Sequence, residues 1–193
     1  MGIPLQTILF CVPSLLAIAW QRRQGCSGAH ARASVGWRLA AWPDLVLGLV
    51  LGAAPGVFLL TLGRGLFQGL ADSPNIAQSY YAGWPLGLPS FLLAALREAL
   101  YVALGEEALF RGLLGGWLVR RLGFAVGNTV QTLVFLLPHL LLLLVSVGLW
   151  PLLAAQFLAG WLCGWLRHRS GSILPGWVAH SLSNAFGALA FMG

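Results

Sequence analysis

Residues 88–119 read LPSFLLAALREALYVALGEEALFRGLLGGWLV and form the longest apolar stretch of this 193-residue chain. A helix that crosses the hydrocarbon core of a bilayer needs about 20 mainly apolar residues. This stretch is well beyond that length, which predicts a tilted or broken membrane-spanning helix. The same test predicts five further spans, at residues 3–20, 44–62, 124–147, 150–166 and 173–192. The predicted fold class is therefore all-α, a polytopic transmembrane helical bundle of about six spans.

The composition favours a membrane protein over a water-soluble domain. Hydrophobic residues make up 59% of the chain and charged residues 8%, whereas soluble domains carry roughly 25% charged residues. With no internal repeat or second soluble region, residues 1–193 are expected to form a single membrane domain. The three cysteines, Cys11, Cys26 and Cys163, form no CxxC pair, so neither a disulfide framework nor a zinc knuckle is expected.

The net charge of +6 comes from 11 Arg and five acids, with no Lys. A basic chain can bind nucleic acid, but here the Arg residues lie in short groups between apolar stretches, as in membrane loops. We therefore expect the lipid bilayer as a partner and no nucleic acid. Arg residues concentrate in the first, third and fifth loops, at positions 22, 23, 32, 38, 120, 121, 167 and 169. The positive-inside rule makes these loops cytoplasmic and places both termini on the opposite side.

Two N-terminal regions need separate interpretation. The first apolar stretch contains a small-x-small site, Ala17 and Ala19, but no basic residue precedes it and two Arg follow it. A retained helix is therefore favoured over a cleaved signal peptide. The region Gly63–Pro89 is rich in Gly, Pro, Asn and Ser and holds Arg64 offset by Asp72. It is expected to be an extracytoplasmic loop.

Ionisable residues within the long apolar stretch mark a candidate site. Glu106, Glu107 and Arg111 lie in its middle, with Arg97 and Glu98 more than two helical turns before them. Such groups are costly inside a bilayer, and those that occur usually face the bundle interior. Glu107 and Arg111 are four residues apart and can form an ion pair. Glu106 lies about 100° round the helix and need not share that partner. A purely structural role for both acids stays an alternative.

Two later stretches carry further polar side chains. His139 stands in a run of Leu directly after Pro138, which lacks an N–H, frees the carbonyl of Val134 and gives the histidine an irregular setting. His180 and Asn184 are four residues apart in the last span, so both project from one face of the helix. Each residue taken alone is also consistent with packing or interhelical hydrogen bonding. Together on three helices they predict one site.

The residue types suit hydrolysis of a peptide bond. A Glu carboxylate can take a proton from water and return it to a leaving amine, and His and Asn supply donors for an oxyanion. Two His and a Glu can also ligate zinc, although the HExxH pairing is absent. A serine mechanism is disfavoured because there is no GxSxG, and the related string Gly25–Gly28 lies in an Arg-rich loop away from the membrane His residues.

The order of these motifs resembles the CPBP family of CAAX proteases and bacteriocin-processing enzymes. The segment Trp165–Pro175 is also similar to the approach to the third motif of this family. The resemblance covers roughly residues 88–193, the CPBP-like catalytic core, and leaves residues 1–87 as N-terminal spans and a loop. The matching motifs are EExxxR at Glu106, Glu107 and Arg111, FxxxH at Phe135 and His139, and HxxxN at His180 and Asn184.

The resemblance implies an intramembrane endopeptidase that hydrolyses peptide bonds of a membrane-associated or lipidated protein or peptide. By this resemblance, Glu106 is the catalytic carboxylate that activates water with help from His139. His180 and Asn184 would stabilise the oxyanion. Glu107 would be a supporting acid, paired with Arg111. Members of the family have been described both as glutamate-type and as metal-dependent. The expectation here is no metal and no cofactor, with zinc as the alternative.

The substrate and the physiological role are left open by the resemblance. Prenylated CAAX substrates belong to one branch of the family, whereas a Gly- and Ala-rich chain without Lys looks bacterial, and CAAX processing is not expected there. A multi-pass protein of the inner (cytoplasmic) membrane is predicted, with unknown oligomeric state. A non-catalytic membrane scaffold or bacteriocin-immunity protein of the same family is the alternative function. A small transporter is disfavoured because no pair of matching broken helices is visible in the two halves.

Overall fold

The computed structural model describes residues 3–61, 80–145 and 147–193, and these residues form helices and no strand. The predicted all-α class is confirmed. The α-helices are α1 (Leu5–Arg23), α2 (Gly28–Ser34), α3 (Trp42–Thr61), α5 (Leu88–Glu98), α6 (Leu104–Glu106), α7 (Gly116–Leu122), α8 (Phe124–Leu136), α9 (Leu142–Val145), α10 (Trp150–Ser170) and α11 (Leu174–Leu189). The π-helical segments are Ala99–Ala103 and Glu107–Gly115, and the 3₁₀ segments are Pro138–Leu141 and Val147–Leu149.

All six predicted spans correspond to helices, but they differ in length. Among the described residues, four helical stretches are long and apolar enough to cross a membrane: Leu5–Arg23, Leu88–Leu122, Phe124–Leu144 and Val147–Ser170. The apolar part of α3, Trp42–Gly56, is shorter, and α11 has 16 residues. The six-span count is therefore approximate.

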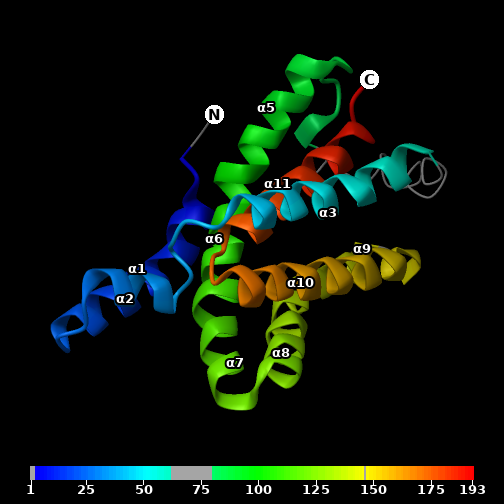
Figure 1. Ribbon diagram of the computed structural model, residues 1–193. Helices are drawn as coiled ribbons and strands as arrows, with labels where there is room; N and C mark the ends of the chain where they lie inside the picture. Colours follow the sequence, from blue (N-terminus) through cyan, green and yellow to red (C-terminus); the bar gives the residue numbers. More distant parts are fainter. Residues whose placement is uncertain (1–2, 62–79, 146) are drawn as a thin grey trace.

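The stretch predicted as tilted or broken is one continuous helix, which runs from α5 through α6 to α7 (Figure 1). Its 35 residues correspond to about 50 Å at 1.5 Å per residue, well beyond the hydrocarbon thickness of about 30 Å. Two π-helical segments, Ala99–Ala103 and Glu107–Gly115, lie within it. Such segments are often found where a helix carries functional side chains. Glu106 and Glu107 stand at the junction between α6 and the second segment.

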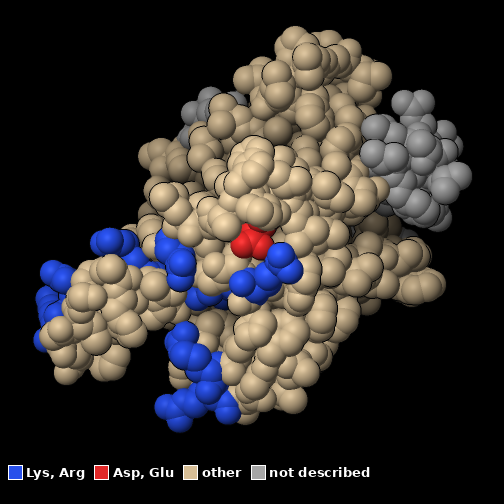
Figure 2. Space-filling view, viewed as in Figure 1, with Lys and Arg blue, Asp and Glu red and all other residues tan. Residues whose placement is uncertain are grey.

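The first, third and fifth loops meet at one end of the bundle. Arg side chains gather there, at the lower left of Figure 2, over α1, α2 and the ends of α7 and α10. The Arg120 guanidinium donates to the Ser34 carbonyl at 3.1 Å, and the Ile173 amide donates to the Gly36 carbonyl at 3.0 Å. When successive spans run in opposite directions, the first, third and fifth loops must all lie on the same side, as they do here. The membrane side that this end faces stays a prediction, and residues 62–79 of the predicted second loop lie outside the described residues.

The two shorter spans, α3 and α11, lie side by side in the same direction (Figure 1). Gly48 packs against the backbone of Pro175, and Gly52, four residues later, packs against the backbone of Ala179. A Cβ added to Gly52 would lie 2.6 Å from the Ala179 carbonyl oxygen. Small residues at four-residue spacing allow membrane helices to approach this closely. The second and sixth spans of an alternating bundle run parallel, as these two do.

The core that positions the site is built by α1 and α11 on opposite parts of the long helix. The Ser14 hydroxyl of α1 donates to the Ala108 carbonyl at 2.8 Å, and a Cβ on Gly105 would lie 2.8 Å from the Cα of Thr7. On the other side, the Trp177 indole of α11 donates to the Ala99 carbonyl at 2.8 Å. The middle of the long helix is therefore enclosed, which buries the residues around Glu106.

Candidate active site

The two adjacent carboxylates on the long helix are both buried but have different partners. Glu107 is fully buried and Arg111 is 1% exposed, and Arg111 NH1 lies 3.1 Å from Glu107 Oε1. This is the ion pair expected from their spacing. The Arg111 guanidinium also lies over the Phe135 ring, 4.0 Å from its centroid. A buried charge is tolerated when it is paired, and this pair fixes the orientation of Glu107.

His180, on α11, lies between the two carboxylates. Its Nδ1 is 3.0 Å from Glu107 Oε1, and its Nε2 is 3.7 Å from Glu106 Oε2. A carboxylate oxygen accepts hydrogen bonds, so Nδ1 is the donor to Glu107, while Nε2 is directed at Glu106. Glu107 thereby fixes the orientation of the His180 ring.

The second oxygen of Glu106 is held by a residue of the first span. Gln6 Nε2, on α1, donates to Glu106 Oε1 at 3.0 Å. Sequence reasoning assigned no role to Gln6, because the family resemblance does not extend to α1. The signal that could have found it is an amide in an otherwise apolar span, since polar groups in a membrane helix usually face partners in the bundle.

Asn184 is held in the same way by another acid of the long helix. Its Nδ2 donates to Glu98 Oε2 at 3.1 Å, while Glu98 Oε1 accepts from the Tyr81 hydroxyl at 2.5 Å and from Arg97 NH1 at 3.0 Å. Burial, and then the bond to Glu98, raise the pKa of Tyr81, so its hydroxyl stays a donor. One N–H of Asn184 is thus used, and a second one remains. Glu98 was noticed in the sequence but was given no role.

His139 lies beside this group without a hydrogen bond to it. Pro138 begins a 3₁₀ turn and, lacking an N–H, leaves the Val134 carbonyl without its helical donor. The Leu137 amide donates to that carbonyl instead, at 3.2 Å. The Nδ1 of His139 is 2.9 Å from the Phe135 carbonyl, so Nδ1 carries the proton and Nε2 the lone pair. The His139 ring lies 4.6 Å from the Phe135 ring, which in turn is 6.2 Å from His180. Phe135 therefore lies in ring contact with both histidines.

The arrangement offers few ligands for a metal ion. Across residues 3–61, 80–145 and 147–193, no group of three or more His, Cys, Asp or Glu side chains is placed to hold one. Glu106 Oε2 and His180 Nε2 face each other, but Nδ1 of His180 is occupied by Glu107. Catalytic zinc sites use three protein ligands. The zinc alternative lacks a third ligand in this arrangement.

The fold and this site define a polytopic helical membrane protein with a buried cluster of glutamate and histidine inside the bundle. Residues 88–186, just over half of the chain, match the family described as type II CAAX prenyl endopeptidase Rce1-like. The chain belongs to this family of membrane proteases, which agrees with the resemblance inferred from its motifs. All three motifs lie within the matched residues. No curated protein and no solved structure matches the chain significantly.

Proposed function

We propose that this chain is an intramembrane endopeptidase of the inner membrane in which Glu106 activates the attacking water. The observation that carries the proposal is the unequal commitment of two neighbouring acids. Glu107 Oε1 is engaged by Arg111 and by Nδ1 of His180. Among the described residues, by contrast, Glu106 has only the neutral amide of Gln6 on one oxygen and directs the other at Nε2 of His180 across 3.7 Å. Two atoms at that separation can both contact one water molecule.

In the proposed reaction, Glu106 takes a proton from this water as the water oxygen bonds to the substrate carbonyl carbon. The carbonyl oxygen becomes an oxyanion, and the second N–H of Asn184 and the Nε2–H of His180 donate to it. His180 carries both ring protons throughout, so the proton on Glu106 comes from the water alone. Glu107 favours that protonated imidazole because it lies 3.0 Å from Nδ1. When the C–N bond breaks, Glu106 returns its proton to the leaving amine. His139 is proposed to orient the water through its unprotonated Nε2.

The proposed substrate is a membrane-associated or lipidated protein or peptide. The buried site supports this class, because a peptide bond must enter the helical bundle to reach Glu106, and a membrane-bound segment is already at that depth. Family membership adds a general preference for such substrates. The identity of the substrate can be sought by comparing the membrane proteomes of cells that carry the wild-type chain and cells that carry Glu106→Gln.

The test of the mechanism is a cleavage assay on a substrate found in this way. Glu106→Gln keeps volume but removes the proton acceptor, and loss of a general base commonly lowers the rate by about 10² to 10⁴. Asn184→Ala is expected to lower it by about 10² to 10³. Glu107→Gln is the matched control, because it makes the same chemical change one residue away but also leaves Arg111 unpaired, so it should lower thermal stability as well as rate.

Each variant is first checked for membrane insertion and monodispersity. A well-folded Glu106→Gln protein with wild-type turnover would eliminate the mechanism and favour the non-catalytic scaffold or immunity function.

We further propose that the reaction needs no metal. Protein stripped by a chelator in detergent is expected to keep its activity. Activity that disappears on stripping and returns with stoichiometric zinc would instead make Glu106, His139 and His180 metal ligands.

A further inference from the structure

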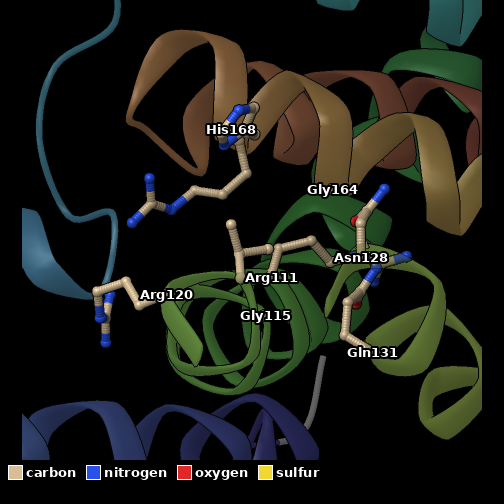
Figure 3. Close-up of a pocket in the computed structure, with 10 residues that line it drawn as sticks. Arg111, Gly115, Arg120, Asn128, Gln131, Gly164 and His168 are labelled. Atoms are coloured by element: carbon tan, nitrogen blue, oxygen red, sulfur yellow. Dashed lines mark hydrogen bonds between the residues drawn. The ribbon is translucent and has the colours of Figure 1, made fainter. Parts of the chain in front are cut away.

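A second polar site lies at the Arg-rich end of the bundle, beyond Arg111 as seen from Glu106. It is a partly open cavity of about 150 Å³ between the long helix, α8 and α10 (Figure 3). No acid lines it among the described residues. Its polar lining consists of four basic and two amide side chains: Arg111, Arg120, Arg167, His168, Asn128 and Gln131.

The positive charge of this cavity is only partly balanced. In the described part of the chain, Arg97, Arg111 and Arg169 pair with acids, while Arg120 and Arg167 do not. Both of the latter donate instead to the Ser34 carbonyl, at 3.1 and 3.4 Å. Two guanidinium groups that share one neutral acceptor repel each other. An anion bound between them would remove that repulsion.

Buried polar atoms in the lining also lack partners. The Nε of Arg111 and the Nε of Arg167 are buried without a hydrogen-bond acceptor among the described residues, and the Oε1 of Gln131 is buried without a donor. Arg111 and Gln131 are 1% and 0% exposed. Buried polar groups are normally satisfied, so unsatisfied ones point to a missing partner. Unpartnered donors and an unpartnered acceptor on residues of one lining suit a ligand that carries both anionic oxygens and a hydroxyl group.

We propose that this cavity binds the phosphate group of an anionic phospholipid with a hydroxylated headgroup. Basic pockets between membrane helices bind such headgroups, and the planar guanidinium matches pairs of phosphate oxygens. Arg120 and Arg167 lie near the ends of α7 and α10, where a span reaches headgroup depth. The cavity volume of about 150 Å³ is well above the roughly 10–15 Å³ that one water molecule needs, which leaves room for a phosphate.

This lipid site is distinct from the proposed catalytic group. The two share Arg111, whose NH1 faces Glu107, so Arg111 is left unchanged in the test. The test removes the other two guanidinium groups with Arg120→Gln combined with Arg167→Gln. Arg121→Gln is the matched control, because it deletes the same charge from the neighbouring position, which does not line the cavity.

The experiment follows the thermal midpoint of the full chain in a neutral detergent at constant ionic strength. Short-chain phosphatidylglycerol, short-chain phosphatidylcholine and inorganic phosphate are titrated separately. A ligand that binds the folded state raises the midpoint in a saturable way. Phosphatidylglycerol is expected to do so in the wild type and in Arg121→Gln, and phosphatidylcholine is not. The double variant should bind phosphatidylglycerol about tenfold more weakly for each guanidinium lost.

The other outcomes are also decisive. A full shift with inorganic phosphate alone, to which phosphatidylglycerol adds nothing, would support the phosphate site and assign it to a soluble ion. An equal response of the wild type and the double variant, or an equal loss in Arg121→Gln, would overturn the proposal. If the double variant does not fold, Val119→Glu places a carboxylate on the cavity wall with both Arg residues retained. A phosphatidylglycerol shift that persists in that variant would overturn the proposal too.

Discussion

The family-matched region, residues 88–186, and the N-terminal spans α1 and α3 contribute to the site in different ways. The matched region supplies charged and imidazole side chains that contact one another, such as Glu107 with His180. The N-terminal spans supply one amide, Gln6, and a close backbone contact at Gly52. The motif residues thus depend on the N-terminal spans for their placement. Chemistry and positioning are encoded in different parts of the chain.

The largest expected effect is in the matched region, at His180. His180→Ala removes the group that faces both Glu106 and Glu107, and the cleavage rate should fall by about 10² to 10⁴. His139→Ala is expected to be comparably damaging, and His30→Ala, a change at an exposed position of α2, is the control. The measurement is kcat for each purified variant. If His139→Ala has nearly wild-type kcat while His180→Ala is inactive, His139 takes no part in the reaction. The catalytic residues would then be those hydrogen-bonded around Glu106.

A middle-sized effect is expected where α3 approaches α11. Gly52→Ala places a Cβ 2.6 Å from the Ala179 carbonyl, and overpacking of this kind typically costs about 1–3 kcal/mol. Gly187→Ala is the matched control, because it makes the same change on α11 where no atom lies within 4 Å. The thermal midpoint should fall for Gly52→Ala and not for Gly187→Ala. Equal midpoints would mean that the close approach of α3 does not hold α11 in place.

The smallest effect is expected at Gln6. Gln6→Ala removes a single hydrogen bond to Glu106, usually worth about 0.5–1.5 kcal/mol, so the rate should fall by no more than about tenfold. Gln21→Ala makes the same change on α1 but deletes a bond to Ser34 of α2, at the Arg-rich end of the bundle. The measurement compares the cleavage rates of Gln6→Ala and Gln21→Ala under conditions in which the two variants are equally stable. A loss at Gln6 as large as that at Glu106 would place Gln6 in the catalytic machinery itself.

Several features of the fold and the site followed from the sequence because they are local. The positions of the six helices come from runs of apolar residues, and the Glu107–Arg111 ion pair comes from helical spacing. The irregular turn at His139 comes from the missing N–H of Pro138. Other features escaped prediction because they join separate helices. Gln6 reaches Glu106 across 100 residues of sequence, and Glu98 holds Asn184 across 86.

The sequence by itself determined that this chain is an all-helical membrane protein with ionisable residues on three helices, in the order of a known protease family. Tertiary structure alone decided which atoms face each other: Nδ1 of His180 meets Glu107, Asn184 meets Glu98, and His139 contacts the ring of Phe135. The physical reason is that helical periodicity fixes relations within one helix. The rotation and depth of one helix against another depend on close contacts between them, such as those of the α3 glycines with α11.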